Sequence, residues 1–232
     1  MRLLAFAVAF ASLAAAAAPA LPTEIAAEYR ISTAGVAIGH VQETYVRTGD
    51  TYRIESTTRA EGVFRLFRDD TIVLSSAGRL GPKGLQPLRF EQRRLGDSSR
   101  DIVADFDWGK AQLRSVYRGE ESVNALPPGT QDRLSVLYQF MHVRQAGEVV
   151  KMHMSNGRKV ELYAYRKVGT PTIDTPAGEF ATLHYERITG SEKENRAQLW
   201  LARDRFSLPV RIVFEDSKGL RLEQNLVSLT TR

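Results

Sequence analysis

Cysteine is absent from the 232-residue chain. Its absence excludes disulfide bonds, thiol nucleophiles and cysteine metal ligands. It also excludes the lipid-carrying N-terminal cysteine of bacterial lipoproteins, so we do not expect a lipid-anchored form. Exported domains that depend on disulfides are usually small, whereas this chain is long enough to bury one sizeable core without them.

A long apolar run occurs only at the N-terminus. Residues 3–18 are apolar apart from one serine, and they follow the single charge of Arg2. This stretch is shorter than the roughly 20 residues of a membrane span, and Ala18-Pro19-Ala20 fits the A-x-A cleavage pattern. We therefore expect a signal peptide over residues 1–20, cleaved after Ala20, and no integral membrane segment in residues 21–232. The mature protein is expected to be soluble and periplasmic, and not a lipoprotein.

Charge of one sign is not concentrated anywhere in the sequence. Lys and Arg number 32 and Asp and Glu number 27, for a formal net charge of +5, and the two signs are interleaved along the chain. Proteins that bind nucleic acid carry a basic stripe or patch, so nucleic acid is not an expected partner. No linker or shift in composition divides the sequence. Residues 21–232 are therefore expected to form a single β-rich domain.

Alternation of apolar and polar residues dominates the sequence after the signal peptide. In residues 101–108 the even positions are apolar and the odd positions mostly acidic, and residues 210–215 also alternate. Strands with one solvated face are typical of antiparallel sheets. Turn signals separate these runs, and Asn156-Gly157 is the strongest because both residues tolerate the positive φ of a tight hairpin. The pattern predicts an all-β, mainly antiparallel fold, either a strongly curved sheet or a β-barrel-like roll of about 10–12 strands.

One segment departs from the alternation. In residues 131–142 the spacing of Leu134, Leu137 and Met141 gives a broad apolar face with helical periodicity. Thr130 is placed to serve as the N-cap. A helix of about three turns is marginal alone, so the sequence predicts one α-helix over residues 131–142 that packs against the sheet.

Four motifs resemble a family of exported bacterial proteins, the domain of unknown function 3108. They are Asp132-Arg133-Leu134-Ser135-x-Leu137-Tyr138, residues 175–180, Leu199-Trp200-Leu201-Ala202, and residues 208–212. The resemblance implies a periplasmic location and a curved antiparallel sheet. It also suggests a likeness to the half-barrels of lipoprotein carriers, in which a helix lies against the concave face. The family brings no established activity or catalytic residues.

Two groups of side chains resemble metal sites. Met152-His153-Met154 contains residue types that bind copper, but on a strand the methionines face one side and the histidine the other. Asp101, Asp105 and Asp107 share a strand face but lack the tight loop that gathers ligands around calcium. The sequence therefore predicts a core role for the methionines, a solvated face for the aspartates, and neither a metal site nor a cofactor.

Motifs of the common hydrolases are absent. The four histidines are scattered along the chain, and no G-x-S-x-G elbow is present. A histidine, a carboxylate and a nucleophile can still meet in space, so a hydrolase with a spatially assembled site stays open as a third reading. No catalytic residue is predicted, and the sequence favours a protein that is not an enzyme.

The apolar surface between the helix and the curved sheet is the candidate binding site. Small barrels hold either a packed core or one small ligand, and both readings stay open. The leading hypothesis is a periplasmic protein that binds a hydrophobic or amphipathic molecule of the cell envelope, such as a lipid. The alternative is an envelope module that binds protein or peptidoglycan partners at its surface and has no internal ligand. The candidate ligand-binding residues are Phe64, Phe67, Leu134, Leu137, Phe140 and Met141.

Overall fold

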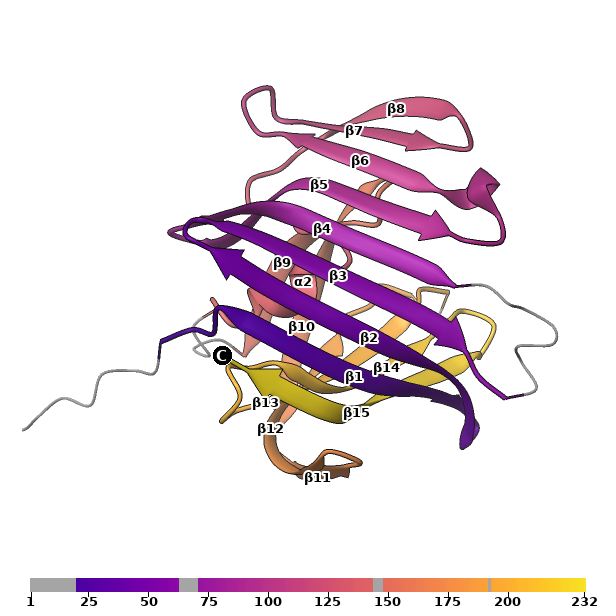
Figure 1. Cartoon of the computed structure of the whole chain (residues 1–232), viewed down its shortest axis with the longest axis vertical. Helices are drawn as coiled ribbons and strands as arrows, with labels where there is room; N and C mark the ends of the chain where they lie inside the picture. Colours follow the sequence, from indigo (N-terminus) through magenta and orange to yellow (C-terminus); the bar gives the residue numbers. More distant parts are fainter. Residues whose placement is uncertain (1–19, 63–70, 144–147, 192) are drawn as a thin grey trace, which may run out of the picture.

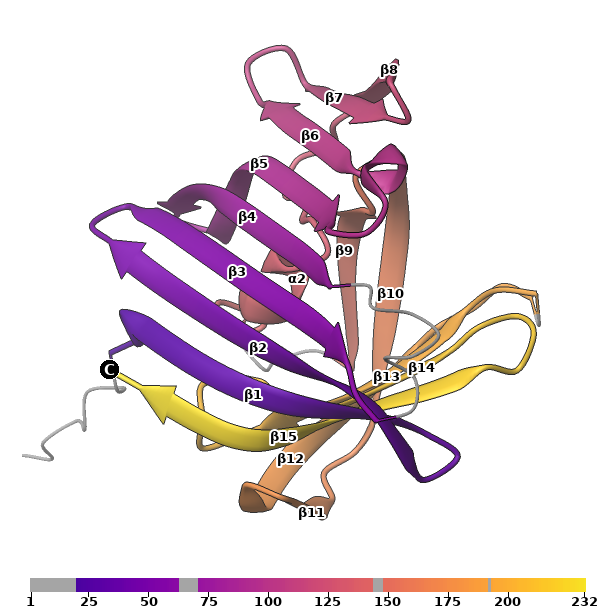
Figure 2. The same cartoon turned by 45° about the vertical axis from the view of Figure 1, so that its right-hand side comes forward.

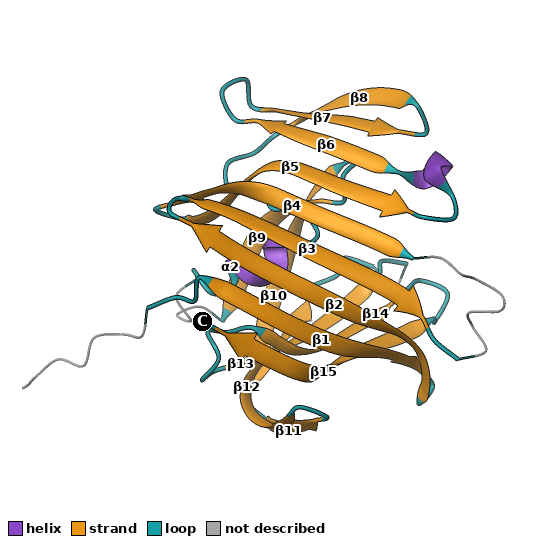
Figure 3. Cartoon of the chain, viewed as in Figure 1, coloured by secondary structure: helices purple, strands orange, loops and turns teal. Residues whose placement is uncertain are grey.

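The computed structural model describes residues 20–62, 71–143, 148–191 and 193–232. In these residues one antiparallel sheet of 15 strands forms almost the whole structure, with one short α-helix, α2, and one 3-10 turn, η1 (Figure 3). The all-β, antiparallel prediction is confirmed, although the strands are more numerous than predicted. Their bounds are β1 Glu24–Thr33, β2 Val36–Thr48, β3 Thr51–Ala60, β4 Ile72–Gly81, β5 Gly84–Arg94, η1 Ser98–Arg100, β6 Ile102–Asp107, β7 Gln112–Tyr117, β8 Glu120–Ala125, α2 Ser135–Gln139, β9 Val149–Ser155, β10 Val160–Gly169, β11 Thr172–Thr175, β12 Gly178–Arg187, β13 Arg196–Ala202, β14 Pro209–Glu215 and β15 Arg221–Thr231.

The first and last strands of the chain meet at the centre of the sheet. Its order is β8-β7-β6-β5-β4-β3-β2-β1-β15-β14-β13-β12-β10-β9, with β11 paired to β12 outside this path. The edge strands are therefore β8 and β9, which follow each other in the chain. We call β1–β8 the first half-sheet and β9–β15 the second half-sheet. The sheet curls so that the two half-sheets face each other with α2 between them (Figures 1 and 2).

The turn that joins β9 to β10 reaches across to the first half-sheet. The side-chain amide of Asn124 in β8 donates to the backbone oxygen of Arg158, with 2.9 Å between Nδ2 and O. The Arg158 guanidinium in turn lies over the Tyr117 ring, 4.2 Å from its centroid. No strand pairing joins β8 to β9 within the described part of the chain. The sheet is therefore an open roll rather than a closed barrel.

Helix α2 is shorter than the sequence predicts, because the chain ahead of it pairs with a strand. Gln131 donates its N–H to His153 O and accepts from Ser155 N, so this residue is extended beside β9. The capping side chain is Asp132, whose Oδ1 accepts from the N–H groups of Leu134 and Ser135. Thr130 instead donates to the backbone oxygen of Pro127. The prediction of an N-cap at Thr130 was wrong.

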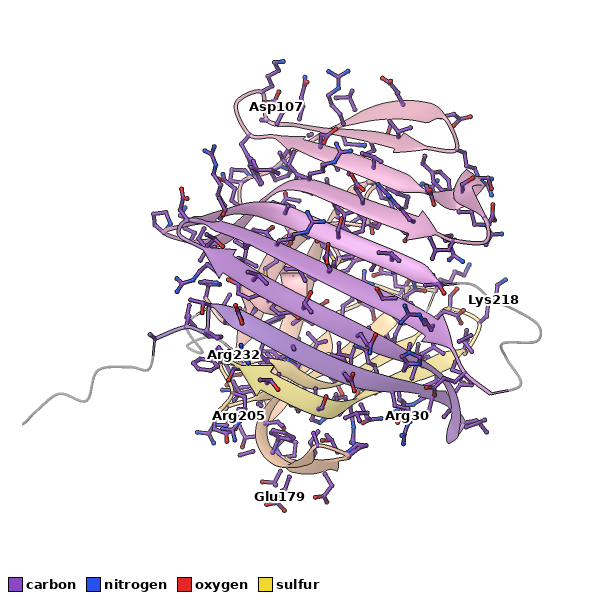
Figure 4. The ribbon with its side chains drawn as sticks, in the orientation of Figure 1. Arg30, Asp107, Glu179, Arg205, Lys218 and Arg232 are labelled. Carbon is purple, nitrogen blue, oxygen red and sulfur yellow. The ribbon has the colours of Figure 1, made fainter. Side chains whose placement is uncertain are left out.

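The short helix is buried because opposite sides of it face the two half-sheets. Leu134 and Tyr138, one turn apart, pack in a cluster with strands of the first half-sheet. Val136 and Phe140 pack with Tyr165 and other residues of the second half-sheet. Each fully buried side chain of this size contributes about 1.5–3 kcal/mol. Charged side chains such as Asp107 and Lys218 project outward (Figure 4).

Candidate functional site

The four predicted ligand-binding residues that the structure describes lie at different depths. Leu134 and Phe140 are fully buried, at 2% and 3% exposure, in two different clusters. Leu137 and Met141 are half-buried. Phe64 and Phe67 lie in residues 63–70, outside the described part of the chain. Of the four candidate residues that the structure describes, two are therefore buried in the core and two remain partly accessible to solvent.

Leu137 lies at the seam between the two half-sheets. It packs against the cluster of the first half-sheet and also against the cluster of the second, yet it keeps partial contact with solvent. Leu74 of β4 and Tyr163 of β10 are also partly buried, one in each cluster. Each of the two clusters thus includes apolar side chains that are only partly buried, and Leu137 belongs to both.

Arg133 lies four residues before Leu137, just ahead of α2, and places a cation beside β5. Its Nη1 donates to Oε1 of Gln92 in β5 at 2.9 Å. Enclosure by protein lowers the pKa of Arg133 and the charge of Arg94 lowers it further, whereas Tyr163 of β10 acts in the opposite direction. The side chain is nevertheless exposed to solvent. Arg133 thus lies between β5, where it binds Gln92, and β10, whose Tyr163 acts on its charge, and part of the residue remains accessible to solvent.

A buried polar network seats the helix on the first half-sheet. Asp132 is fully buried, and its Oδ2 accepts from the hydroxyl of Ser76 in β4. The hydroxyl groups of Ser76 and Tyr52 are 3.2 Å apart. Ser135 Oγ accepts from Asp132 N, which completes a reciprocal capping box with the Asp132 carboxylate. The Asp-x-x-Ser part of the helix motif thus fixes the start of the helix.

Glu43 is a buried acid that sequence reasoning missed. It is 5% exposed in β2, on the strand face that also carries the buried residues Val41 and Tyr45. Burial raises the pKa of Glu43 to about 7, although hydrogen bonds from Tyr138 and Ser56 lower it. The signal was present in the sequence, because the alternation of β2 assigns this acid to the apolar face.

A groove of about 440 Å³ runs beside the edge strand β9. Its walls are β9 itself on one side and the β4–β5 turn, the chain before Gln131 and the end of α2 on the other. The groove is lined by Lys83, Pro128, Gly129, Gln139, Val143, Val149, Val150, Lys151, Met152 and His153.

The side chains considered as metal ligands have other partners. Met152 is buried and Met154 partly buried in the cluster around Phe140, as the strand alternation predicts. Asp105 pairs with Arg89, with 2.6 Å between Oδ1 and Nη1, and Asp107 pairs with Lys110. No group of three or more histidine, aspartate or glutamate side chains in the described residues could hold a metal ion.

The described residues thus form an open antiparallel roll around one enclosed helix, with a groove beside the edge strand β9. A family model described as "Protein of unknown function (DUF3108)" matches residues 26–225. The chain belongs to the DUF3108 family. No curated protein matches the sequence. Among the described residues, no helix is long and apolar enough to cross a membrane.

Solved structures that are similar to this chain include proteins from two bacteria. One is a protein from Bacteroides fragilis described as exported, with a YmcC-like fold; it is 12% identical, with a TM-score of 0.34, and the match covers 91% of this chain and 97% of that one. The other is a protein from Parabacteroides distasonis described as a lipoprotein; it is 12% identical, with a TM-score of 0.36, and the match covers 90% and 97%.

Proposed function

We propose that the protein is a periplasmic, non-enzymatic binding protein that holds a hydrophobic or amphipathic molecule of the cell envelope between α2 and the curled sheet. The observation that carries the proposal is the position of Leu137. This side chain contacts the apolar clusters of both half-sheets and yet is reached by solvent. An acyl chain laid against it would be shielded from water on two sides.

Arg133 adds the polar end of an amphiphile site. It lies four residues before Leu137, is exposed to solvent, and donates a hydrogen bond to the side chain of Gln92. An arginine beside an apolar surface suits a ligand with an anionic head and an apolar tail, because guanidinium groups pair with carboxylate and phosphate oxygens. The ligand class is therefore an anionic amphiphile such as a fatty acid or a phospholipid.

Native mass spectrometry of the protein, exported in a bacterial host and purified from the periplasm without detergent, tests this proposal. We expect a stoichiometric extra mass that is lost on solvent extraction, on a polypeptide whose mass corresponds to residues 21–232. Leu137→Arg is expected to abolish the extra mass, because it places a second cation on the apolar wall. Arg133→Gln is expected to weaken the binding of anionic lipids more than that of neutral ones.

Leu162→Arg is the matched control, since Leu162 of β10 is 56% exposed and its change to arginine should leave binding intact. Circular dichroism of each variant separates loss of binding from loss of fold. A clean apo mass, with no binding when purified envelope lipids are added back, would contradict the proposal.

A further inference from the structure

The edge strand β9 keeps part of its backbone unpaired. On one side β9 forms a full ladder with β10, from Val149 opposite Arg166 to Ser155 opposite Val160. On the other side the only backbone partner within the described residues is Gln131, which pairs with His153 O and Ser155 N. Backbone groups of a strand alternate between its two edges. The N–H and C=O groups of Val149 and Lys151 therefore point to the open side, as those of residues 153 and 155 do.

Gln131 shows that the open side of β9 accepts a strand. It lies beside β9 and forms a single parallel β-bridge with Met154. The side chain of Gln131 fixes this position, because its Nε2 donates to Leu85 O at 2.8 Å and lies 3.3 Å from Gly129 O. Next to Gln131, the space along the same side of β9 forms the groove of about 440 Å³. The groove thus begins where an existing strand bridge ends.

The far wall of the groove is fixed by hydrogen bonds. Gln139, at the end of α2, accepts from Leu85 N and donates to Lys83 O, at 2.8 Å each. These bonds hold the β4–β5 turn opposite β9. One side of the groove is thus unpaired backbone of β9, and the other side is held in place by hydrogen bonds. Such a groove suits an extended segment, because the segment can form main-chain hydrogen bonds along its length.

The positive charge of the groove favours an acidic partner segment. Among the residues that the structure describes, its lining includes Lys83 and Lys151 and no acidic residue. Lys151 lies in the middle of the edge strand and is exposed. Two β9 edges paired antiparallel about this position would place their Lys151 side chains opposite each other, and such like-charge pairs are unfavourable. A second copy joined through β9 is therefore disfavoured, and an acidic segment is favoured.

We propose that the groove beside β9 docks an extended, acidic peptide segment of a partner protein, which adds as a strand to the open edge at Val149 and Lys151. Backbone pairing supplies the affinity, and Lys83 and Lys151 select acidic side chains. The site is separate from the seam at Leu137, so the protein has a place to meet a partner that is independent of any bound amphiphile.

Selection from a random ten-residue peptide library displayed on phage, with residues 21–232 as the target, tests this proposal. We expect enrichment of acidic, β-branched peptides. In nuclear magnetic resonance, a synthetic copy of a selected peptide should slow amide exchange at Val149 and Lys151. Replacing glutamates of that peptide by lysine, or methylating its alternate backbone nitrogens, should each abolish binding.

Lys151→Pro is the decisive variant. Proline removes the outward N–H without removing a hydrogen bond to β10, and edge strands tolerate it. We expect the peptide to bind about tenfold more weakly or not at all, and Lys151→Glu to lower the affinity for acidic peptides alone. Val123→Pro in the other edge strand, β8, is the matched control and should leave binding unchanged. No enrichment, binding indifferent to Lys151→Pro, or self-association through β9 in light scattering would each overturn the proposal.

Discussion

Tyr138 of α2 donates a hydrogen bond to Glu43 of β2, with 3.2 Å between Oη and Oε2, and both side chains are buried. Ser56 of β3 donates to the other carboxylate oxygen, also at 3.2 Å. The Tyr138 ring stacks on that of Tyr45, with 5.3 Å between centroids. The acid thus lies inside the contact that holds the helix on the first half-sheet. Its ionisation is therefore coupled to the stability of that contact.

The contribution of Glu43 to the stability of the protein should fall as the pH rises from about 4.5 to about 7. Burial raises the pKa of Glu43 from 4.5 to about 7, so over this range the folded state holds a proton that the unfolded chain releases. The contribution is fully present below pH 4.5 and is lost as the pH passes 7. Its size is at most about 3 kcal/mol. Urea unfolding at pH 5, 6, 7 and 8 measures the trend.

The variant Glu43→Gln isolates this contribution, because the amide is neutral at every pH. We expect it to gain stability relative to the wild type as the pH rises, by about 1–3 kcal/mol at pH 8. Glu55→Gln is the control, since Glu55 is an exposed acid on the next strand paired with Arg53. Parallel pH profiles for the wild type and Glu43→Gln would show that this acid is not the titrating group.

Asp132→Ala should be one of the more destabilising single substitutions in the chain. It leaves the N–H groups of Leu134 and Ser135 and the hydroxyl of Ser76 without their acceptor. The expected cost is about 2–4 kcal/mol, measured by urea unfolding. Asp97→Ala is the comparison, because Asp97 accepts from Ser99 at an exposed turn and its loss should cost only about 0.5 kcal/mol. Equal costs would mean that the capping box does not secure the helix.

The strands, the turns and the family could be predicted from the sequence, because each depends on residues that are close together in the chain. Alternation over residues 101–108 and the turn at Asn156-Gly157 reappear as β6 and the β9–β10 hairpin. The length of α2 was not predictable in this way. The side chains of residues 131–142 have helical spacing, but Gln131 is drawn into a bridge with Met154, more than 20 positions further along the chain. Long-range pairing overrides local propensity here.

The candidate site was only partly predictable for the same reason. The spacing of Leu137 and Met141 places them on the apolar face of the predicted helix, and both are half-buried in the structure. Leu134 and Phe140 satisfy the same pattern and are fully buried. The difference depends on how the two half-sheets close around α2. The groove beside β9 depends equally on topology, because no residue pattern shows that β9 is an edge.

Gly157 should tolerate alanine much less well than Gly219, although the two glycines have nearly the same φ of +85° and +84°. A Cβ added at Gly157 would lie 2.6 Å from Cγ2 of Ile102 and 3.2 Å from the Phe90 ring, whereas nothing lies within 4 Å at Gly219. Backbone strain alone costs about 1–2 kcal/mol at each position. The clash should add about 1–3 kcal/mol at Gly157. Thermal and urea unfolding of the two variants measure the difference, and equal losses would mean that the hairpin does not press on the first half-sheet.

The fluorescence of Trp200 should report the protonation of His184, because the two rings stack at 4.1 Å with an interplanar angle of 11°. Burial lowers the pKa of His184 below its usual 6.5, although Glu186 and Gln198 act in the opposite direction. We expect the emission to fall on acidification with a midpoint below pH 6.5, since a protonated imidazole in contact with indole quenches it. The folded protein takes up this proton at lower pH than the unfolded chain, so His184 also makes the protein less stable as the pH falls below 6.5.

Trp108→Phe removes the other tryptophan, so that the remaining signal comes from Trp200 alone. In that background His184→Gln should give emission that does not change between pH 7.5 and pH 4.5, and a surviving transition would assign the quenching to another group.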